Sequence, residues 1–166
     1  AAEGVHATDW RAALTERDRE SWATFMLEDA RTPSALLFGR RTYDYFAPRY
    51  PTRTDQLART VNNLPKYVLS TTLTDPEWAN TTVLGGMDEV AKLRETAEGE
   101  IRLYGSSLLA QSLLAAGLVD EMRLLIFPLV LGKGQRLFDG GDEKPWRLVD
   151  VRRVGDSFAL LTYGLR

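Results

Sequence analysis

The apolar and polar positions of this chain switch repeatedly between helical and extended spacing, and the first clear helix covers residues 15–30. Trp22, Phe25, Met26 and Ala30 recur there at helical spacing, with charged residues on the other face. The same reasoning predicts four further helices, each bounded by glycine, proline or a capping residue. One begins at residue 39 and ends at the prolines at 48 and 51, and the others cover residues 55–63, 88–97 and 108–116.

Short apolar runs lie between these helices and predict β-strands. Ala35 to Phe38 is uniformly apolar, which is typical of a strand buried on both faces. Further strands are expected at 66–70, 82–84, 101–104 and 122–127. The tail differs, because residues 146–154 and 157–165 flank Gly155-Asp156, the signature of a β-hairpin.

Strands that alternate with helices imply a mostly parallel central sheet covered by helices on both faces. The predicted fold is therefore a three-layer α/β architecture, to which the closing hairpin adds antiparallel edge strands. The 166 residues contain no internal repeat and no low-complexity linker, so we expect a single domain over residues 1–166.

Composition excludes several classes of function. The 21 basic and 23 acidic residues give a net charge of −2, so no bulk field attracts nucleic acid or an anionic membrane. No apolar run is long enough to cross a bilayer. Cysteine is absent and His6 is the only histidine, which argues against disulfides and a metal site and fits a cytoplasmic protein.

Glycine- and hydroxyl-rich segments follow four of the predicted strands. The carboxyl ends of parallel strands meet at one edge of a sheet, where ligands of open α/β sheets bind. We therefore expect these segments to lie together and to form a binding site. They are Gly39 to Thr42, Ser70 to Thr72, Gly85-Gly86 and Gly105 to Ser107.

The junction at Gly105, Ser106 and Ser107 joins a strand directly to a helix. Backbone N–H groups at a helix start are unpaired and, with the helix dipole, favour a phosphate. The alternative is an ordinary serine cap after a tight turn, which the motif alone favours.

The segments at 39–42 and 70–72 add charge and hydroxyl groups. Arg40 and Arg41 provide planar donors suited to phosphate, although an exposed basic turn capped by Thr42 explains them equally well. For Ser70 to Thr72, simple turn chemistry is the alternative. If an arginine meets Ser70 across adjacent strand ends, the pair suits the extra ribose phosphate that separates NADP from NAD. The G-x-G-x-x-G spacing is absent, so a dinucleotide would bind in another way.

Candidates for proton transfer are weaker. Asp18, Glu20 and Asp44 are the acids nearest to the aromatic residues of the first third, but a solvated surface position is favoured for each. No catalytic residue is identified.

Five motifs in this order and spacing resemble the reductase domain at the C-terminus of the riboflavin-biosynthesis protein RibD, whose fold is that of dihydrofolate reductase. They are Leu37 to Tyr43, Lys66 to Leu73, Tyr104 to Leu108, Gly117 to Glu121, and Pro128 to Gly134 with Leu137-Phe138. The resemblance implies a stand-alone NADPH-dependent reductase, commonly a homodimer.

The resemblance also assigns roles to residues. Gly39, Arg40, Arg41 and Thr42 correspond to the element that contacts the cofactor phosphates, and Ser70, Thr71 and Thr72 to the ribose-phosphate and adenine end. Gly105, Ser106, Ser107 and Leu108 correspond to the pyrophosphate turn, with Gly-Ser where relatives often have Gly-Gly. Gly85 belongs to the fourth segment of the same edge.

Two departures from the family pattern concern the N-terminal part. The first strand of the family, which ends in a Leu-Asp-Gly-like turn, is expected to be missing, because the chain starts at Ala1. The acid that binds substrate in dihydrofolate reductases falls near Trp22 or Ala23, where no carboxylate exists.

The leading hypothesis is therefore hydride transfer from NADPH to the C=N or C=O group of a small pyrimidine- or pteridine-like heterocycle. The alternative is a non-catalytic NADP(H)-binding protein on the same fold, and a purely structural dimer ranks last. Apolar strands at Met122 to Leu131 and in the tail hairpin lie near a sheet edge, which favours a homodimer.

Overall fold

The computed structural model describes residues 14–130, 132, 134–138 and 143–165, and the expectation about a missing first strand before Ala1 concerns a part of the chain outside them. The chain divides into two compact units. The described part of unit 1 is Leu27–Ala110, and that of unit 2 comprises residues 14–26 and 111–165 with the gaps above. Among the described residues, no helix has the length and apolar character needed to cross a membrane.

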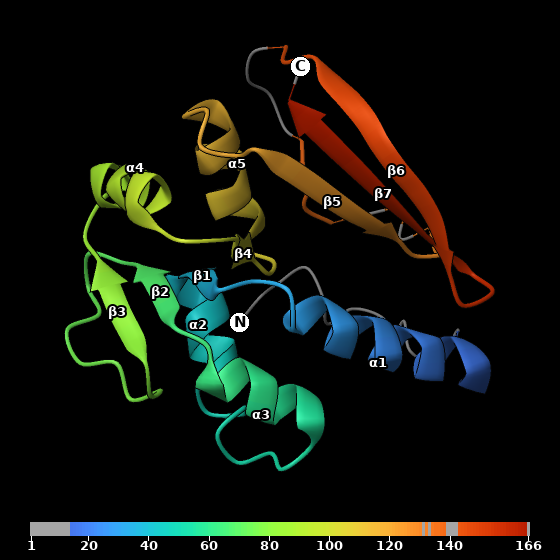
Figure 1. Cartoon of the computed structure of the whole chain (residues 1–166), viewed down its shortest axis with the longest axis horizontal. Coiled ribbons are helices and arrows are strands. Elements are labelled where there is room, and N and C mark those ends of the chain that lie inside the picture. Colours follow the sequence, from blue (N-terminus) through green and yellow to red (C-terminus); the bar gives the residue numbers. More distant parts are fainter. Residues whose placement is uncertain (1–13, 131, 133, 139–142, 166) are drawn as a thin grey trace. The chain divides into compact units, whose positions relative to one another are not determined.

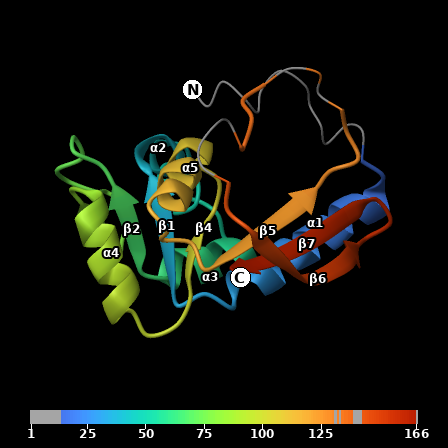
Figure 2. The same ribbon diagram turned by 90° about the horizontal axis from the view of Figure 1, so that it is seen from above.

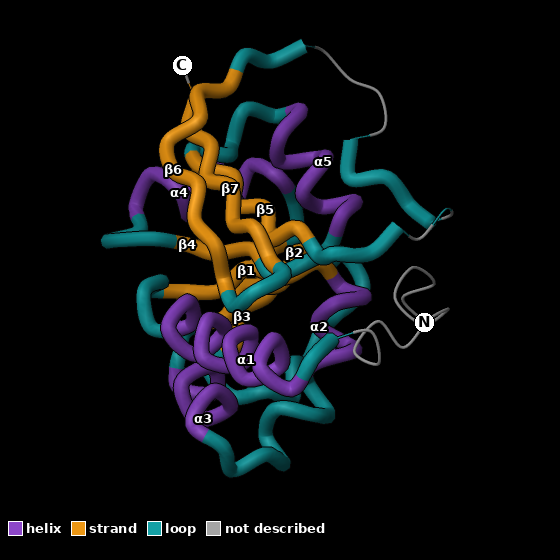
Figure 3. The backbone as a smooth tube through the Cα atoms, turned by 90° about the vertical axis from the view of Figure 1, so that its right-hand side faces the viewer, coloured by secondary structure: helices purple, strands orange, loops and turns teal. Residues whose placement is uncertain are grey.

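Unit 1 is built on a four-stranded parallel sheet in the order β3-β2-β1-β4. Its strands are β1 (Ala35–Gly39), β2 (Lys66–Leu69), β3 (Thr81–Leu84) and β4 (Ile101–Leu103). The connecting helices are α2 (Arg40–Phe46), α3 (Gln56–Asn63) and α4 (Met87–Thr96). Figures 1 and 3 show α4 on one face of this sheet and α2 and α3 on the other, which confirms the predicted layered α/β arrangement.

The core of unit 1 lies between the sheet and the α2–α3 face. Phe38 of β1 and Val68 of β2 are fully buried against Tyr43 and Trp78, whose ring stacks on Phe38 with centroids 5.8 Å apart. The hydroxyl of Tyr43 accepts a hydrogen bond from the backbone N–H of Trp78 at 3.2 Å. This core fixes α2, and with it the residues that follow β1.

Lys66, the first residue of β2, is completely buried. Its ammonium donates to the carbonyl oxygens of Val61 (3.2 Å), Asn62 (2.9 Å) and Leu64 (2.6 Å) at the end of α3. These carbonyls have no partner within the helix, and a cation suits the negative end of the helix dipole. Burial lowers the pKa of Lys66 to about 8.

A second buried polar cluster lies at the beginning of β4. The Arg102 guanidinium pairs with the Asp29 carboxylate and donates to the Asp29 carbonyl oxygen at 2.9 Å. The hydroxyl of Tyr104 donates to the other Asp29 carboxylate oxygen at 2.6 Å, and Glu100 also accepts from Arg102. Burial and the Asp29 hydrogen bond raise the pKa of Tyr104. Every charge in the cluster therefore has a partner.

Unit 2 contains a three-stranded antiparallel sheet in the order β5-β7-β6. The strands are β5 (Glu121–Ile126), β6 (Trp146–Val154) and β7 (Phe158–Leu165). Two helices are shared between the units: α1 (Glu16–Ala30) ends in unit 1, and α5 (Ser107–Ala115) begins there. Phe158 and Leu160 of β7 pack with Phe25 of α1 in the core of unit 2.

The predicted strand at 122–127 exists as β5, but its expected place in the parallel sheet was wrong. It pairs antiparallel with β7 instead of extending the parallel sheet. An apolar run predicts a strand, yet it carries no information about the direction of a partner strand whose paired residues lie 33 to 43 positions along the chain.

The expected solvated position of Asp18 was also wrong, because its side chain is buried in unit 2. It accepts hydrogen bonds from the Ser157 hydroxyl at 2.8 Å and the Thr15 hydroxyl at 2.8 Å, and from the backbone N–H groups of Asp156 and Ser157. These bonds lower the pKa of Asp18. Thr15 and Asp18 form the capping pair at the start of α1, a spacing visible in the sequence.

Candidate functional site

The four glycine- and hydroxyl-rich segments of unit 1 all follow carboxyl ends of its parallel strands. Gly39 at the end of β1 lies beside Leu69 at the end of β2, which lies beside Leu84 at the end of β3, and Leu37 lies beside Leu103 of β4. Figure 2 shows β2, β1 and β4 running side by side. The strand order therefore brings the four segments to one edge, as parallel pairing requires.

Ser106 joins the ends of β1 and β4. Its side-chain oxygen accepts a hydrogen bond from the Gly39 backbone N–H at 3.1 Å and lies 2.5 Å from the Thr42 hydroxyl oxygen. Gly105 and Ser106 both adopt left-handed backbone conformations, with φ of 71° and 58°. Such a conformation is strained for serine but not for glycine, so the two side-chain hydrogen bonds offset the strain at Ser106.

Beside Ser106, the close approach at this junction favours glycine at position 39. A Cβ atom added to it would lie 2.8 Å from the Ser106 side-chain oxygen, which is closer than real Cβ contacts. In contrast, a Cβ on Gly105 would meet nothing within 4 Å, so this glycine is needed for its backbone angle and has open space beside it.

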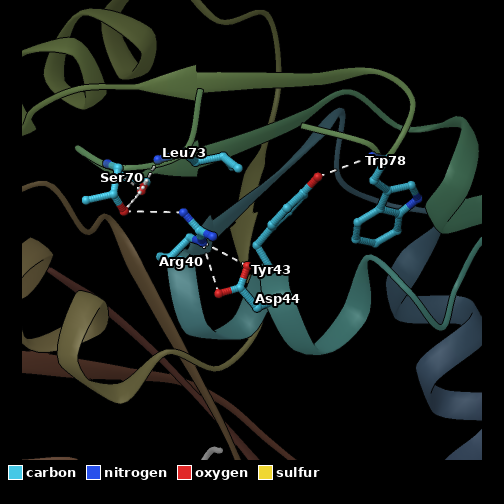
Figure 4. A network of polar contacts seen from close by, with 7 residues as sticks. Arg40, Tyr43, Asp44, Ser70, Leu73 and Trp78 are labelled. Carbon is cyan, nitrogen blue, oxygen red and sulfur yellow. Dashed lines mark hydrogen bonds and ion pairs between the residues drawn. The ribbon is translucent and has the colours of Figure 1, made fainter. Parts of the chain in front are cut away.

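Arg40 connects the end of β1 with the turn after β2 (Figure 4). Its Nε donates to both Asp44 carboxylate oxygens, at 2.8 and 3.0 Å, and its Nη1 donates to the Thr72 hydroxyl at 3.3 Å. The Arg40 side chain is still 39% exposed. The guanidinium thus lies across two strand ends with further N–H groups able to bind an anion.

The Ser70 hydroxyl supports the turn after β2. Its oxygen accepts from the backbone N–H groups of Thr72 at 3.2 Å and Leu73 at 3.1 Å, and it lies 3.4 Å from the Thr72 hydroxyl. The turn chemistry that the sequence suggested as the alternative is therefore present. It also holds Thr72 where Arg40 meets it, so the two interpretations of Ser70 to Thr72 are compatible.

The helix that follows β3 is the least suited to a phosphate. The N-terminal cap residue of α4 is Gly86, which has no side chain to cap the helix. Two acidic residues, Asp88 and Glu89, occupy the first turn of α4. A Cβ on Gly85 would lie 3.2 Å from a Glu89 carboxylate oxygen, and one on Gly86 would lie 2.6 Å from a carboxylate oxygen of Asp88. Gly85 is thus at the expected edge but beside two carboxylates, which repel an anion.

The remaining predicted site residues line the same edge with different exposure. Arg41 and Thr71 are exposed, Ser107 is partly buried, and Leu108 at the start of α5 is 52% exposed.

The N-terminal caps of α2 and α3 differ. The cap residue of α2 is Gly39, which makes no side-chain hydrogen bond to the helix. The cap residue of α3 is Asp55, whose carboxylate accepts a hydrogen bond from the Ala58 N–H at 3.1 Å.

Asp44 was considered only as a proton-transfer candidate, and its contact with Arg40 was not anticipated. The two residues are four positions apart on α2, a spacing at which opposite charges meet on a helix. That spacing is visible in the sequence and would have identified the pair. Ser106 was expected at this turn, but its contacts with Gly39 and Thr42 gave no comparable signal, because they depend on a backbone angle that serine rarely adopts.

The model of one protein family, the RibD C-terminal domain, matches residues 4–160. The chain belongs to the RibD C-terminal domain family. This is a reductase family, and the match covers parts of both units.

Similar proteins agree with this membership. The chain is 35% identical to the uncharacterized protein YyaP of Bacillus subtilis (strain 168) over 138 residues, which are 77% of this chain and 72% of that protein. A crystal structure of a putative riboflavin biosynthesis protein from Shewanella sp. PV-4 has a TM-score of 0.72 at 23% identity, covering 96% of this chain and 88% of the other.

The structure of Acinetobacter baumannii RibD (form 2) has a TM-score of 0.61 at 16% identity. The match covers 91% of this chain but only 51% of the A. baumannii protein, so the chain spans about half of that protein's length. At these identities, the two solved structures show that the fold is shared.

Proposed function

We propose that the protein is a reductase that binds NADPH at the carboxyl edge of the parallel sheet and transfers hydride to a small pyrimidine- or pteridine-like heterocycle. Membership in a reductase family supports the class of reaction. The observation that carries the choice of cofactor is Arg40, whose guanidinium connects the β1 end with the turn after β2.

The chemistry of the donors at this edge fits a dinucleotide with an additional ribose phosphate. Arg40, Arg41, Thr71 and Thr72 offer charged and hydroxyl donors for the ribose phosphate. The backbone N–H groups at the start of α5, after the open space beside Gly105, suit the pyrophosphate. No carboxylate other than Asp44 bonds to Arg40 among the described contacts.

The bound cofactor would supply the hydride, and this chain would supply binding and orientation. Ser106 keeps the β1 and β4 ends at a fixed separation by accepting from Gly39 and contacting Thr42. The Ser70 turn and Asp44 together hold Arg40 in position. These contacts prepare the edge for a ligand before it arrives, which lowers the entropy lost on binding.

Titration with NADPH and NADH, followed by cofactor fluorescence, tests the proposal. We expect saturable NADPH binding with a Kd of tens of micromolar or below, and NADH binding at least about tenfold weaker. Arg40→Gln should weaken NADPH binding about tenfold and leave NADH binding unchanged. It removes the positive charge proposed to bind the additional phosphate, which NADPH has and NADH lacks.

Arg59→Gln is the matched control, since Arg59 is an exposed arginine on α3. It should bind both cofactors like the original protein. Absence of saturable NADPH binding would contradict the proposal, and so would an equal loss of NADPH and NADH affinity in Arg40→Gln.

A second candidate function is a protein that binds NADP(H) without catalysis. It is favoured by the lack of a carboxylate at Trp22 and Ala23, and by Asp18, whose oxygens are bonded to the Ser157 turn. Turnover assays with a pyrimidine ribosylamino phosphate and with a dihydropteridine separate the candidates. NADPH oxidation that depends on one of these substrates supports the reductase, whereas tight NADPH binding without oxidation supports the second candidate.

A further inference from the structure

The buried polar cluster at β4 extends to the carboxyl end of that strand through Tyr104. Arg102 of β4 pairs with the Asp29 carboxylate near the end of α1, and the Tyr104 hydroxyl donates to the other Asp29 carboxylate oxygen at 2.6 Å. Asp29 and Arg102 are buried, whereas Tyr104, the residue directly after β4, is only partly buried. Tyr104 is therefore the member of the cluster that reaches the surface at the carboxyl end of β4.

Tyr104 lies on the face of the parallel sheet that α2 and α3 cover, because it packs against the core cluster that contains Phe38 and Val68. The next residue, Gly105, is exposed, and a Cβ atom on it would meet nothing within 4 Å. The helix α5 begins at Ser107. The tyrosine thus lies immediately before the turn that is proposed to hold the pyrophosphate, with open space beside the next residue.

The strand order gives the direction in which a dinucleotide would cross this edge. Arg40 and Thr72, proposed for the additional ribose phosphate, follow β1 and β2, whereas the turn proposed for the pyrophosphate follows β4. Among the described residues, β4 is the last strand of the sheet on its side. A dinucleotide that runs from β2 towards β4 would place its nicotinamide beyond the pyrophosphate, at the β4 end of the edge. A substrate that receives hydride must lie against that ring.

The Tyr104 oxygen is suited to accept a hydrogen bond. It donates its own proton to Asp29, and a phenol oxygen that has donated its proton keeps lone pairs for an N–H group. Donation to a carboxylate polarises the hydroxyl and strengthens the oxygen as an acceptor. Burial, together with the Asp29 hydrogen bond, raises the pKa of Tyr104, so the hydroxyl keeps its proton at physiological pH. Such an oxygen favours a ligand N–H group over a ligand carbonyl oxygen.

We propose that the Tyr104 hydroxyl, oriented by Asp29, accepts a hydrogen bond from an N–H group of the heterocyclic substrate. The inference rests on the proposed function, because the course of the cofactor along the edge brings the substrate to Tyr104. Tyr104 is the residue that contacts the substrate, and Asp29 is a positioning residue that acts through it. The substrate is then a heterocycle with N–H donors on the edge that meets the protein, such as an aminopyrimidine or an aminopteridine.

Two pteridines of equal size test this contact. A diaminopteridine carries N–H donors only in its amino groups, and the dimethylpteridine with the same substitution pattern has no N–H donor. Isothermal titration calorimetry measures both affinities, with and without NADP⁺. We expect the original protein to bind the diamino compound about tenfold more tightly than the dimethyl compound. Tyr104→Phe should bind the two compounds equally, with its affinity for the dimethyl compound unchanged.

Tyr43→Phe is the matched control. It also removes a hydrogen-bonded tyrosine hydroxyl from the core of unit 1, because the Tyr43 oxygen accepts from the Trp78 N–H. Tyr43 belongs to α2, so this variant should keep the tenfold preference for the diamino compound. Circular dichroism and thermal unfolding verify that both tyrosine variants are folded.

A double-mutant cycle tests the positioning role of Asp29. Asp29→Asn should reduce the preference for the diamino compound about threefold in the original protein. In the Tyr104→Phe background it should have no further effect, because Asp29 reaches the ligand only through the tyrosine. A loss by the same factor in both backgrounds would refute the positioning role. If Asp29→Asn does not fold, the two tyrosine variants decide the proposal.

Three results would overturn the proposal. They are equal or absent binding of the two pteridines by the original protein, a preference that survives in Tyr104→Phe, and a preference that is lost equally in Tyr43→Phe. Failure of the proposed function is a separate result, namely the absence of saturable NADPH binding. The titrations without NADP⁺ report on Tyr104 in either case.

Discussion

At the amino ends of the parallel strands in unit 1, charged side chains are buried and bonded to groups of the protein, whereas those at the carboxyl ends stay partly exposed. Lys66 opens β2 with no exposed surface, and Arg102 near the start of β4 is 9% exposed. At the other end, the Arg40 side chain is 39% exposed and bonded to Asp44 and Thr72.

The difference separates two tasks of polar groups in one small sheet. A buried charge must find its partners within the chain, and losing one leaves a costly unpaired group. An exposed group adds little to stability and keeps hydrogen-bonding capacity for a ligand. Substitutions of the charged residues at the amino ends should therefore change the free energy of unfolding and spare cofactor binding, and substitutions of the exposed charged residues at the carboxyl ends should do the reverse.

The largest effect is expected for Arg102→Met. It leaves the buried Asp29 carboxylate without its guanidinium partner, and such a change typically lowers the free energy of unfolding by about 3–5 kcal/mol. Urea unfolding followed by tryptophan fluorescence measures the loss. Arg40→Met is the matched control and should lose less than about 0.5 kcal/mol. A loss below about 1 kcal/mol in Arg102→Met would contradict the assigned role of the buried cluster.

Lys66→Met should change how stability depends on pH. The folded-state pKa of Lys66, about 8, lies below the unfolded value of about 10.4, so between these values the unfolded state binds more protons. The free energy of unfolding of the original protein should therefore rise relative to that of Lys66→Met by about 2 kcal/mol between pH 7 and pH 10.

Guanidinium unfolding of both proteins at matched pH values measures this difference. The destabilising contribution of the charged lysine is fully present below pH 8 and disappears as the pH passes the unfolded pKa. Parallel pH profiles for the two proteins would show that Lys66 keeps an ordinary pKa in the folded state.

Replacement of Ser106 separates strain from hydrogen bonding at the carboxyl end. Ser106→Ala keeps a side chain at φ 58° and removes the acceptor of the Gly39 N–H, whereas Ser106→Gly removes both the acceptor and the strain. We expect Ser106→Gly to be more stable than Ser106→Ala by about 1 kcal/mol. Thermal unfolding measures the order, and equal stabilities would exclude backbone strain at this position.

The smallest effect on stability is expected for Asp44→Asn. The Arg40–Asp44 pair is exposed and four positions apart on α2, so its loss should change the free energy of unfolding by about 0.5 kcal/mol or less. NADPH affinity should rise about threefold, because a carboxylate no longer neutralises the arginine assigned to the phosphate. Lower affinity would instead show that orientation by Asp44 outweighs its charge.

The position of the candidate edge was predictable because it depends on chain direction alone. Once strands and helices alternate, the segments after Phe38, Leu69, Leu84 and Tyr104 must meet, and the structure confirms that they do. The roles assigned to individual residues at this edge remain predictions.

The buried charges were not predictable by the same reasoning. Arg102 and Asp29 are 73 positions apart, and nothing in the local pattern links them. Nothing in the local pattern marks Lys66 as buried, since only the folded chain brings the end of α3 over its ammonium. The direction of β5 failed for the same reason, because it depends on a partner at the far end of the chain.

The contact between Gly39 and Ser106 has a consequence for the divergence of this family. A methyl group at position 39 would lie 2.8 Å from the serine oxygen and 3.3 Å from the serine Cβ, so an alanine there requires that position 106 first lose its hydroxyl. The two positions are therefore expected to evolve as a pair, with the loss of the oxygen at 106 coming before a larger residue at 39. In a library randomised at both sites, folded clones with alanine at 39 should carry glycine or alanine at 106.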